Sequence, residues 1–94
     1  MDMDACYIRS PAFVSRQIGD ENILVPISQS SSEVECVYTL NNVAAEIWEL
    51  LDGDHSLLDI LEDIESEFNV DKDKARIDLL KFIQELESIK AVKK

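Results

Sequence analysis

The chain has 94 residues, of which 46% are hydrophobic and 31% are charged, a balance typical of a single globular domain. No apolar run approaches the roughly 18 residues that a membrane-spanning helix needs. The first residues lack the basic and apolar parts of a signal segment. We therefore expect a cytoplasmic protein with no membrane partner.

The formal net charge of −11 is unevenly distributed along the chain. Residues 1–70 hold two basic and fifteen acidic residues, a net charge of −13. Residues 71–94 hold seven basic and five acidic residues, a net charge of +2. An acidic body repels the phosphate backbone of nucleic acids. The charge therefore argues against nucleic acid as a partner.

Residues suited to catalysis or metal binding form no recognisable pattern. Cys6 and Cys36 lie far apart and form no C-x-x-C pair, so idle thiols are the simplest interpretation. The single histidine, His55, follows Asp54 in a predicted turn, and the chain has neither a glycine-rich loop nor a nucleophile motif. We predict that the protein is not an enzyme and binds no cofactor or metal.

The first half of the chain predicts three strands. In order, we expect an irregular segment (1–12), a strand (13–18), a turn (19–22), a strand (23–27), a polar loop (28–32) and a strand (33–40). Pro26 should remove one ladder hydrogen bond, while Ile23, Val25 and Ile27 share a face. Side chains alternate along the third strand, with Tyr38 and Leu40 on one face. Short turns between consecutive strands indicate an antiparallel sheet.

Three amphipathic helices are predicted after the strands. Asn41 or Asn42 caps the first helix, which should run to Asp52-Gly53 and bury Trp48 as its largest anchor. Ser56 with Asp59 forms a capping box at the start of the second helix, and Asn69 is a C-terminal stop. The third helix should start at Asp71 or Asp73. The positions expected to face the core are Val43, Ala44, Ile47, Leu51, Leu57, Leu58, Ile60, Leu61, Ile64, Phe68, Ala75, Leu79, Phe82, Ile83, Leu86 and Ile89.

Two apolar residues of the third helix, Ile77 and Leu80, lie roughly 100° or more from the centre of its apolar arc. One interpretation is that they pack against the sheet or the first helix. The other is that they line a groove rimmed by Lys74 and Lys81, with Gln84 on the same flank. The sequence pattern leaves both interpretations open.

The order and spacing of several motifs resemble the PqqD family. Residues 40–53 read L-N-x-x-A-x-x-I-W-x-L-L-D-G, and Ile23-Leu24-Val25-Pro26 is similar to the I-L-V-P strand of one branch. Further matches are Ser56-Leu57-x-Asp59-Ile60, Phe68-x-Val70-Asp71 and Ala75-x-x-Asp78-Leu79-x-x-Phe82. The chain departs from the family where Asn42-Val43-Ala44 replaces the more usual Glu-Thr-Gly, and in the loop at 28–32. These departures concern loop contacts and leave the fold intact.

The resemblance implies an α+β winged helix-turn-helix, with a three-stranded antiparallel sheet followed by three helices, over residues 13–92. It also implies a peptide chaperone that binds the leader of a ribosomally synthesised precursor by β-strand addition. The chaperone would present the precursor to a modifying enzyme, commonly a radical SAM protein. On this basis the peptide-binding residues would be Glu35, Cys36, Val37, Tyr38 and Thr39 on the third strand and Lys74, Ile77, Leu80, Lys81 and Gln84 on the third helix.

Two other functions are compatible with a winged helix. The third helix, which carries Lys72, Lys74, Arg76 and Lys81, could be the recognition helix of a DNA-binding regulator, although Asp71, Asp73 and Asp78 interleave with these cations. The domain could also be a generic protein scaffold. The sequence identifies neither the precursor nor the modification nor the partner enzyme. It also leaves open whether the third strand's exposed edge pairs two copies of the chain.

Overall fold

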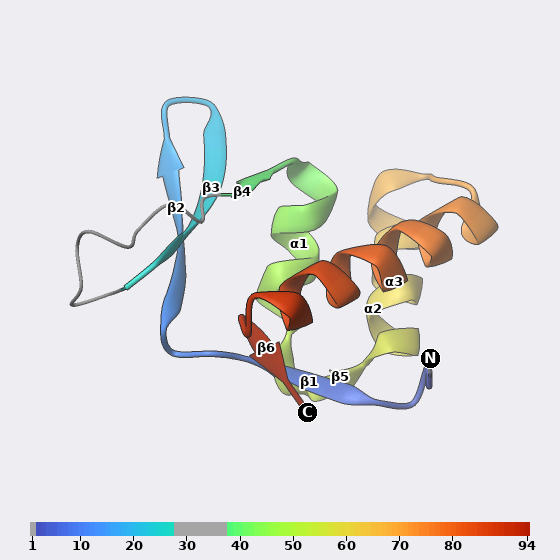
Figure 1. Cartoon of the computed structure of the whole chain (residues 1–94). Helices are drawn as coiled ribbons and strands as arrows, with labels where there is room; N and C mark the ends of the chain where they lie inside the picture. Colours follow the sequence, from blue (N-terminus) through green and yellow to red (C-terminus); the bar gives the residue numbers. More distant parts are fainter. Residues whose placement is uncertain (1, 28–37) are drawn as a thin grey trace.

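A computed structural model describes residues 2–27 and 38–94, and it confirms the predicted α+β architecture of a three-stranded antiparallel sheet followed by three helices (Figure 1). The elements are β1 (Cys6–Arg9), β2 (Phe13–Ile18), β3 (Glu21–Pro26), β4 (Tyr38–Leu40), α1 (Asn42–Leu50), β5 (Asp52–Ser56), α2 (Leu57–Phe68), α3 (Lys72–Ser88) and β6 (Val92–Lys93).

The predicted sheet has the strand order β2-β3-β4, and both pairs are antiparallel. The β2–β3 hairpin projects away from the helices (Figure 1). Pro26 lies opposite Phe13, whereas the next residue, Ile27, donates its N–H to the Ala12 carbonyl at 2.6 Å. Because hydrogen-bonded pairs alternate along an antiparallel ladder, Pro26 falls in a non-bonded pair and leaves the β2–β3 ladder intact. The predicted loop at 28–32 and the start of the third strand lie outside the described residues.

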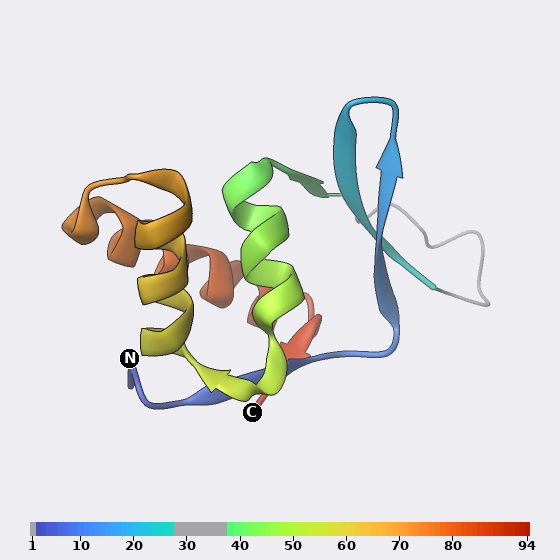
Figure 2. The same ribbon diagram turned by 180° about the vertical axis from the view of Figure 1, so that it is seen from behind.

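A second sheet, with the order β5-β1-β6, corrects the expectation that residues 1–12 are irregular. Ile8 on β1 pairs with Asp52 on one side and with Lys93 on the other. His55 therefore lies in a strand and not in the predicted turn. Figure 2 shows β1 running beneath α1 and α2, so the second sheet closes one end of the helical layer. Pairing with distant segments, and not local sequence, makes these residues extended.

Local capping signals set the helix boundaries much as predicted. The Asn41 side chain accepts a hydrogen bond from the Ala44 N–H, and Ser56 and Asp59 form the expected reciprocal capping box. Asn69 ends α2 in the left-handed conformation, and Asp71 caps α3. Helix α1 ends at Leu50, short of the predicted Asp-Gly stop, because the following residues enter β5.

The core is formed mainly by the facing sides of the three helices, together with residues from both sheets. Trp48 is only 3% exposed, which confirms its predicted place in the core, and Leu24 is the fully buried residue of β3. Leu58 is exposed, whereas Val43, Ala44, Phe68, Phe82 and Ile89 are half-buried at the core boundary. The buried hydrophobic residues are Tyr7, Leu24, Leu40, Ile47, Trp48, Leu51, Leu57, Ile60, Leu61, Ile64, Ala75, Leu79, Ile83, Leu86, Ala91 and Val92.

Arg9, the last residue of β1, closes the C-terminal end of α1. Its Nη1 donates to the carbonyl oxygens of Trp48 and Glu49, each at 3.0 Å. Helix α1 has no basic residue in its own last turn, so Arg9 supplies the positive charge that favours a helix C-terminus. This contact ties the second sheet to the helix that follows β4.

Candidate functional site

The outer edge of β4 is the first part of the candidate site. Among the described residues, β4 pairs only with β3, so its other edge carries no partner strand. The bond between Ile27 and Ala12 fixes which β3 residues direct their backbone groups toward β2. By alternation, Ile23 points toward β2 and Leu24 toward β4, where its partner is Tyr38. Thr39, between Tyr38 and Leu40, therefore directs its N–H and C=O outward.

The position of this edge is fixed by the residues that follow it. Leu40 is buried in the core, and Asn41 caps α1 directly after the strand ends. Thr39 itself is exposed. Because one end of β4 is held by the core and by a helix cap, the free backbone groups of Thr39 keep a fixed position relative to the helices.

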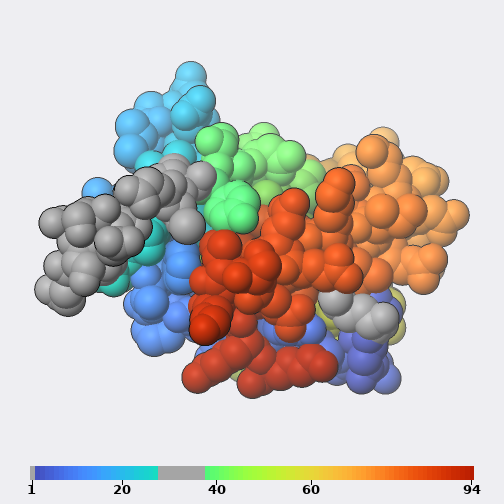
Figure 3. All heavy atoms as spheres, in the orientation of Figure 1, coloured from blue at the N-terminus to red at the C-terminus, as the bar shows by residue number. Residues whose placement is uncertain are grey.

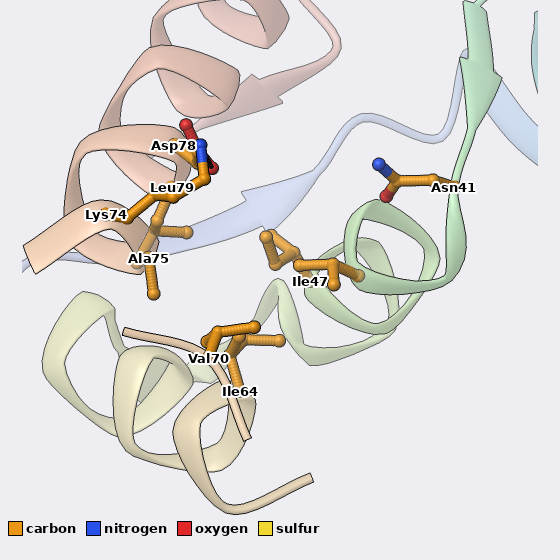
Figure 4. A pocket seen from close by; sticks show the side chains of 9 residues that line it. Asn41, Ile47, Ile64, Val70, Lys74, Ala75, Asp78 and Leu79 are labelled. Carbon is orange, nitrogen blue, oxygen red and sulfur yellow. Dashed lines mark ion pairs between the residues drawn. The ribbon is translucent and has the colours of Figure 1, made fainter. Parts of the chain in front are cut away.

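A cavity of about 210 Å³ lies beyond the end of β4, and we call it the interhelical cavity (Figure 4). Most of its walls are apolar and come from all three helices and the turn between α2 and α3. Its lining residues are Asn41, Val43, Ile47, Ile64, Val70, Lys74, Ala75, Asp78 and Leu79. The cavity is therefore an apolar recess whose polar lining groups come from the end of β4 and from α3.

The polar residues on the α3 side of the cavity are an ion pair. Lys74 Nζ lies 3.7 Å from a carboxylate oxygen of Asp78, and both side chains are largely exposed. Figure 4 shows these two residues on α3, across the cavity from Asn41 at the end of β4. Because the two charges compensate each other, this rim has no excess of either sign.

The structure brings only some of the predicted site residues to this region. Glu35, Cys36 and Val37 lie outside the described residues, whereas Tyr38 is half-buried and Thr39 is exposed. On α3, Lys74 lines the cavity, and Ile77 is 62% exposed. Lys81 and Gln84 are exposed, while Leu80 is half-buried against the core.

The geometry of α3 separates the predicted residues further. At about 100° per residue, Lys74 lies about 40°, Lys81 about 60° and Ile77 about 100° from Asp78 around the helix axis. Of these three residues, only Lys74 lines the cavity. Leu80 lies about 160° from Asp78, on the far flank. Figure 3 shows α3 (orange to red) across the middle of the molecular surface in this view, beside α1 (green). A contact of Leu80 or Gln84 with a ligand stays a prediction.

Sequence reasoning missed the interhelical cavity. Its walls include Ile47, Ile64 and Leu79, which helical periodicity assigns to the core. Periodicity identifies the apolar face of each helix, but it does not show where the apolar faces of three packed helices leave a gap. The sequence holds one signal: Val70 is an apolar residue directly after the predicted helix stop at Asn69. In the structure Val70 lines the cavity and remains 37% exposed.

Titratable groups elsewhere form pairs that do not adjoin the cavity. His55 Nδ1 lies 2.9 Å from a carboxylate oxygen of Asp52, and this hydrogen bond raises the pKa of the imidazole and lowers the pKa of the carboxyl group. A hydrogen bond with Asp63 raises the pKa of Glu46. Cys6 is a free, half-buried thiol. Within residues 2–27 and 38–94, no three His, Cys, Asp or Glu side chains converge as metal ligands.

A solved structure and a family model show which known proteins the chain is similar to. It is similar to the solved structure "TbiB1 in Complex with the TbiA(beta) Leader Peptide", with 27% identity, a TM-score of 0.71, and coverage of 92% of this chain and 94% of that one. No curated protein sequence matched the chain. None of the described helices has the length and apolar character to cross a membrane. The family model "Coenzyme PQQ synthesis protein D (PqqD)" matches residues 30–92, more than half of the chain, and the chain therefore belongs to the PqqD family.

Proposed function

We propose that the protein is a non-catalytic peptide chaperone. It binds the leader of a ribosomally synthesised precursor as an added strand along β4 and presents that precursor to a modifying enzyme. The proposed enzyme is a radical SAM protein, the class that the family resemblance implies. Because ribosomes release such precursors in the cytoplasm, the proposal puts the protein there.

The observation that carries this proposal is the outer edge of β4, which has no partner strand among residues 2–27 and 38–94. An unpaired strand edge is a template for a further strand, whose backbone hydrogen bonds supply affinity while side-chain pockets supply specificity. Thr39 offers an outward N–H and C=O at this edge. Buried Leu40 and the Asn41 cap hold the C-terminal end of this edge in place, which reduces the ordering that binding would require there.

Membership of the PqqD family and the likeness to TbiB1 support the same function. TbiB1 was solved with the TbiA(beta) leader peptide, and its likeness to this chain extends over 92% of the chain. That coverage includes segments outside the family match, which begins at residue 30. This chain and TbiB1 therefore share one fold over nearly their whole length, and TbiB1 was solved with a leader peptide bound.

The proposed contact surface combines the β4 edge with the side of α3 that faces the cavity. On the strand we assign Tyr38 and Thr39. Glu35, Cys36 and Val37, which lie outside the described residues, stay part of the predicted set. On the helix we assign Lys74, which lines the cavity, together with Lys81 and Ile77, which lie about 60° and 100° from Asp78 around the helix axis. Ile77 is the most exposed large apolar residue of the described chain. Leu80 and Gln84 complete the predicted set. The surface is suited to an extended peptide with apolar residues and one or two acidic ones.

DNA binding is the less favoured alternative. The acidic body opposes approach to a duplex, and on α3 the charge of Lys74 is compensated by Asp78 at 3.7 Å. A DNA-binding regulator should retain a non-specific duplex at low salt, whereas the proposed chaperone should not.

The test is a peptide selection followed by mapping of the binding surface. Short random peptides displayed as a library are selected on the wild-type chain, and the tightest peptide is titrated into isotope-labelled protein. We expect the largest amide shifts at Tyr38, Thr39 and the neighbouring part of α3, and tenfold or greater weakening by Ile77→Asp. Ile18→Asp, on the remote hairpin tip, is the control for an equally exposed isoleucine. Shifts confined to other surfaces, or selection of no peptide, would overturn the proposal.

A further inference from the structure

We propose that the interhelical cavity receives one bulky apolar side chain of the bound peptide, and that this anchor sets the register of the added strand. The inference rests on the proposed function, because it requires a peptide along β4. It adds a specificity determinant that lies beyond the strand edge and is built from all three helices.

The size and chemistry of the cavity define the anchor. Its volume is about 210 Å³. An apolar cavity of about 150 Å³ can hold benzene, so there is room for an aromatic ring or a branched aliphatic side chain. Apolar groups of Val43, Ile47 and Leu79 could not satisfy a buried polar side chain, which would lose its hydrogen bonds to water. The cavity therefore selects a Phe, Leu, Ile or Met side chain over a polar one.

The position of the cavity links it to the strand edge. Asn41 contributes to the cavity lining and lies two positions after Thr39, whose backbone groups face the incoming peptide. A strand rises about 3.3 Å per residue, so the anchor should lie two or three residues from the peptide residue that bonds Thr39. The peptide is then fixed at two points, the residue that bonds Thr39 and the anchor in the cavity. A shift of the peptide by one residue along β4 would turn the anchor side chain to the other face of the strand, so this register is excluded.

The rim of the cavity favours an uncharged anchor. Lys74 and Asp78 already neutralise each other across 3.7 Å, so a charged side chain entering the cavity would find no uncompensated partner. Either rim residue remains solvent-exposed and can meet a charge on the residues that flank the anchor. This arrangement is suited to a single apolar residue within a polar segment of peptide.

The test fills the cavity and measures the coupling to one peptide position. Val70→Phe places an aromatic ring at the exposed wall of the cavity, and Leu58→Phe places the same ring on an exposed part of α2 outside the cavity. Each peptide residue is replaced by alanine in turn, and affinities are measured by fluorescence anisotropy with the library-selected peptide. Circular dichroism checks that each variant is folded.

We expect Val70→Phe to weaken binding roughly 10- to 100-fold, the loss that follows when a large apolar side chain stays exposed to water. Leu58→Phe should bind as wild type. At one apolar peptide position, two or three residues from the partner of Thr39, replacement by alanine should weaken binding to the wild-type protein. The same replacement should cause no further loss of affinity for the Val70→Phe variant. Equal affinity of Val70→Phe and wild type would overturn the inference.

A second measurement needs no substitution in the protein. In the wild-type complex, nuclear Overhauser contacts should connect the anchor side chain with methyl groups of Val43, Ile47 and Val70. Their absence in a saturated complex contradicts the inference even if Val70→Phe unfolds. The inference is also contradicted if these methyl groups show contacts only with a second copy of the chain, or only with a small apolar solute, and none with the peptide. If wild type selects no peptide at all, the proposed function fails first, so the two failures are distinguishable.

Discussion

Proline substitution at two adjacent residues of β4 tests which backbone groups are free. The N–H of Thr39 points outward, whereas Tyr38, opposite Leu24, directs its N–H into the sheet. Proline removes the N–H and is tolerated in a strand only where that group faces an open edge. Thr39→Pro should therefore leave the fold intact and impair peptide binding, while Tyr38→Pro should damage the fold.

The magnitudes follow from what each substitution removes. Loss of one backbone hydrogen bond to the peptide costs about 0.5–1.5 kcal/mol, and the proline ring also obstructs the added strand, so Thr39→Pro should weaken binding about tenfold or more. Its free energy of unfolding should change by less than about 1 kcal/mol, because no bond to β3 is lost. Tyr38→Pro breaks a ladder bond beside the fully buried Leu24 and should cost about 1–3 kcal/mol of stability.

The assay pairs urea denaturation with anisotropy titration of the selected peptide. Thr39→Ala is the matched control, because it removes the exposed side chain but keeps the N–H, and its affinity should stay within about twofold of wild type. A Thr39→Pro variant that is folded and binds the peptide normally would refute strand addition at Thr39. The reverse pattern, with Thr39→Pro unstable and Tyr38→Pro stable, would mean that the strand alternation has been assigned to the wrong residues.

Three further predictions concern the framework that holds the edge. Trp48→Ala should lower the free energy of unfolding by about 3–5 kcal/mol, because a 3%-exposed core side chain is lost; a change under about 1 kcal/mol in urea titration would contradict this packing. Arg9→Gln should cost about 1–2 kcal/mol by removing donors to the Trp48 and Glu49 carbonyls, and an unchanged denaturation midpoint would show that this cap contributes little. The hydrogen bond between His55 and Asp52 raises the pKa of His55 above 6.5 and lowers the pKa of Asp52 below 3.8. Its stabilisation is fully present between those two values, and it is lost as pH rises through the raised pKa or falls through the lowered one. His55→Ala should thus lower the melting temperature at about pH 5.5 but not at about pH 8.5, and equal effects at both would contradict the linkage.

The parts of the fold that the sequence predicted are those determined by nearby residues. Asn41 bonds the residue three positions ahead, and Ser56 and Asp59 satisfy each other across one turn. By contrast, β1 becomes a strand only because Ile8 meets Asp52 and Lys93, which lie far along the chain. No local pattern encodes such a pairing, so the expectation of an irregular segment at 1–12 is wrong for Cys6–Arg9.

The candidate site divides in the same way. Alternation along the third strand predicted that Thr39 and Leu40 face opposite ways, and Ile77 was correctly set apart from the core arc. Which N–H groups point outward depends on the register with β3, and the interhelical cavity depends on how three helices pack. Leu80 illustrates the limit of helical periodicity: its angle placed it off the core arc, yet the packed structure half-buries it.

Amide hydrogen exchange at Thr39 tests strand addition along β4 most directly. In the free protein the Thr39 amide should exchange rapidly, while the Tyr38 amide should be protected by its bond to β3. Saturation with the selected peptide should slow exchange at Thr39 at least about tenfold, because the added strand accepts its N–H, and should leave Tyr38 little changed. A saturated complex in which Thr39 still exchanges at its free rate would contradict peptide binding by strand addition at this edge.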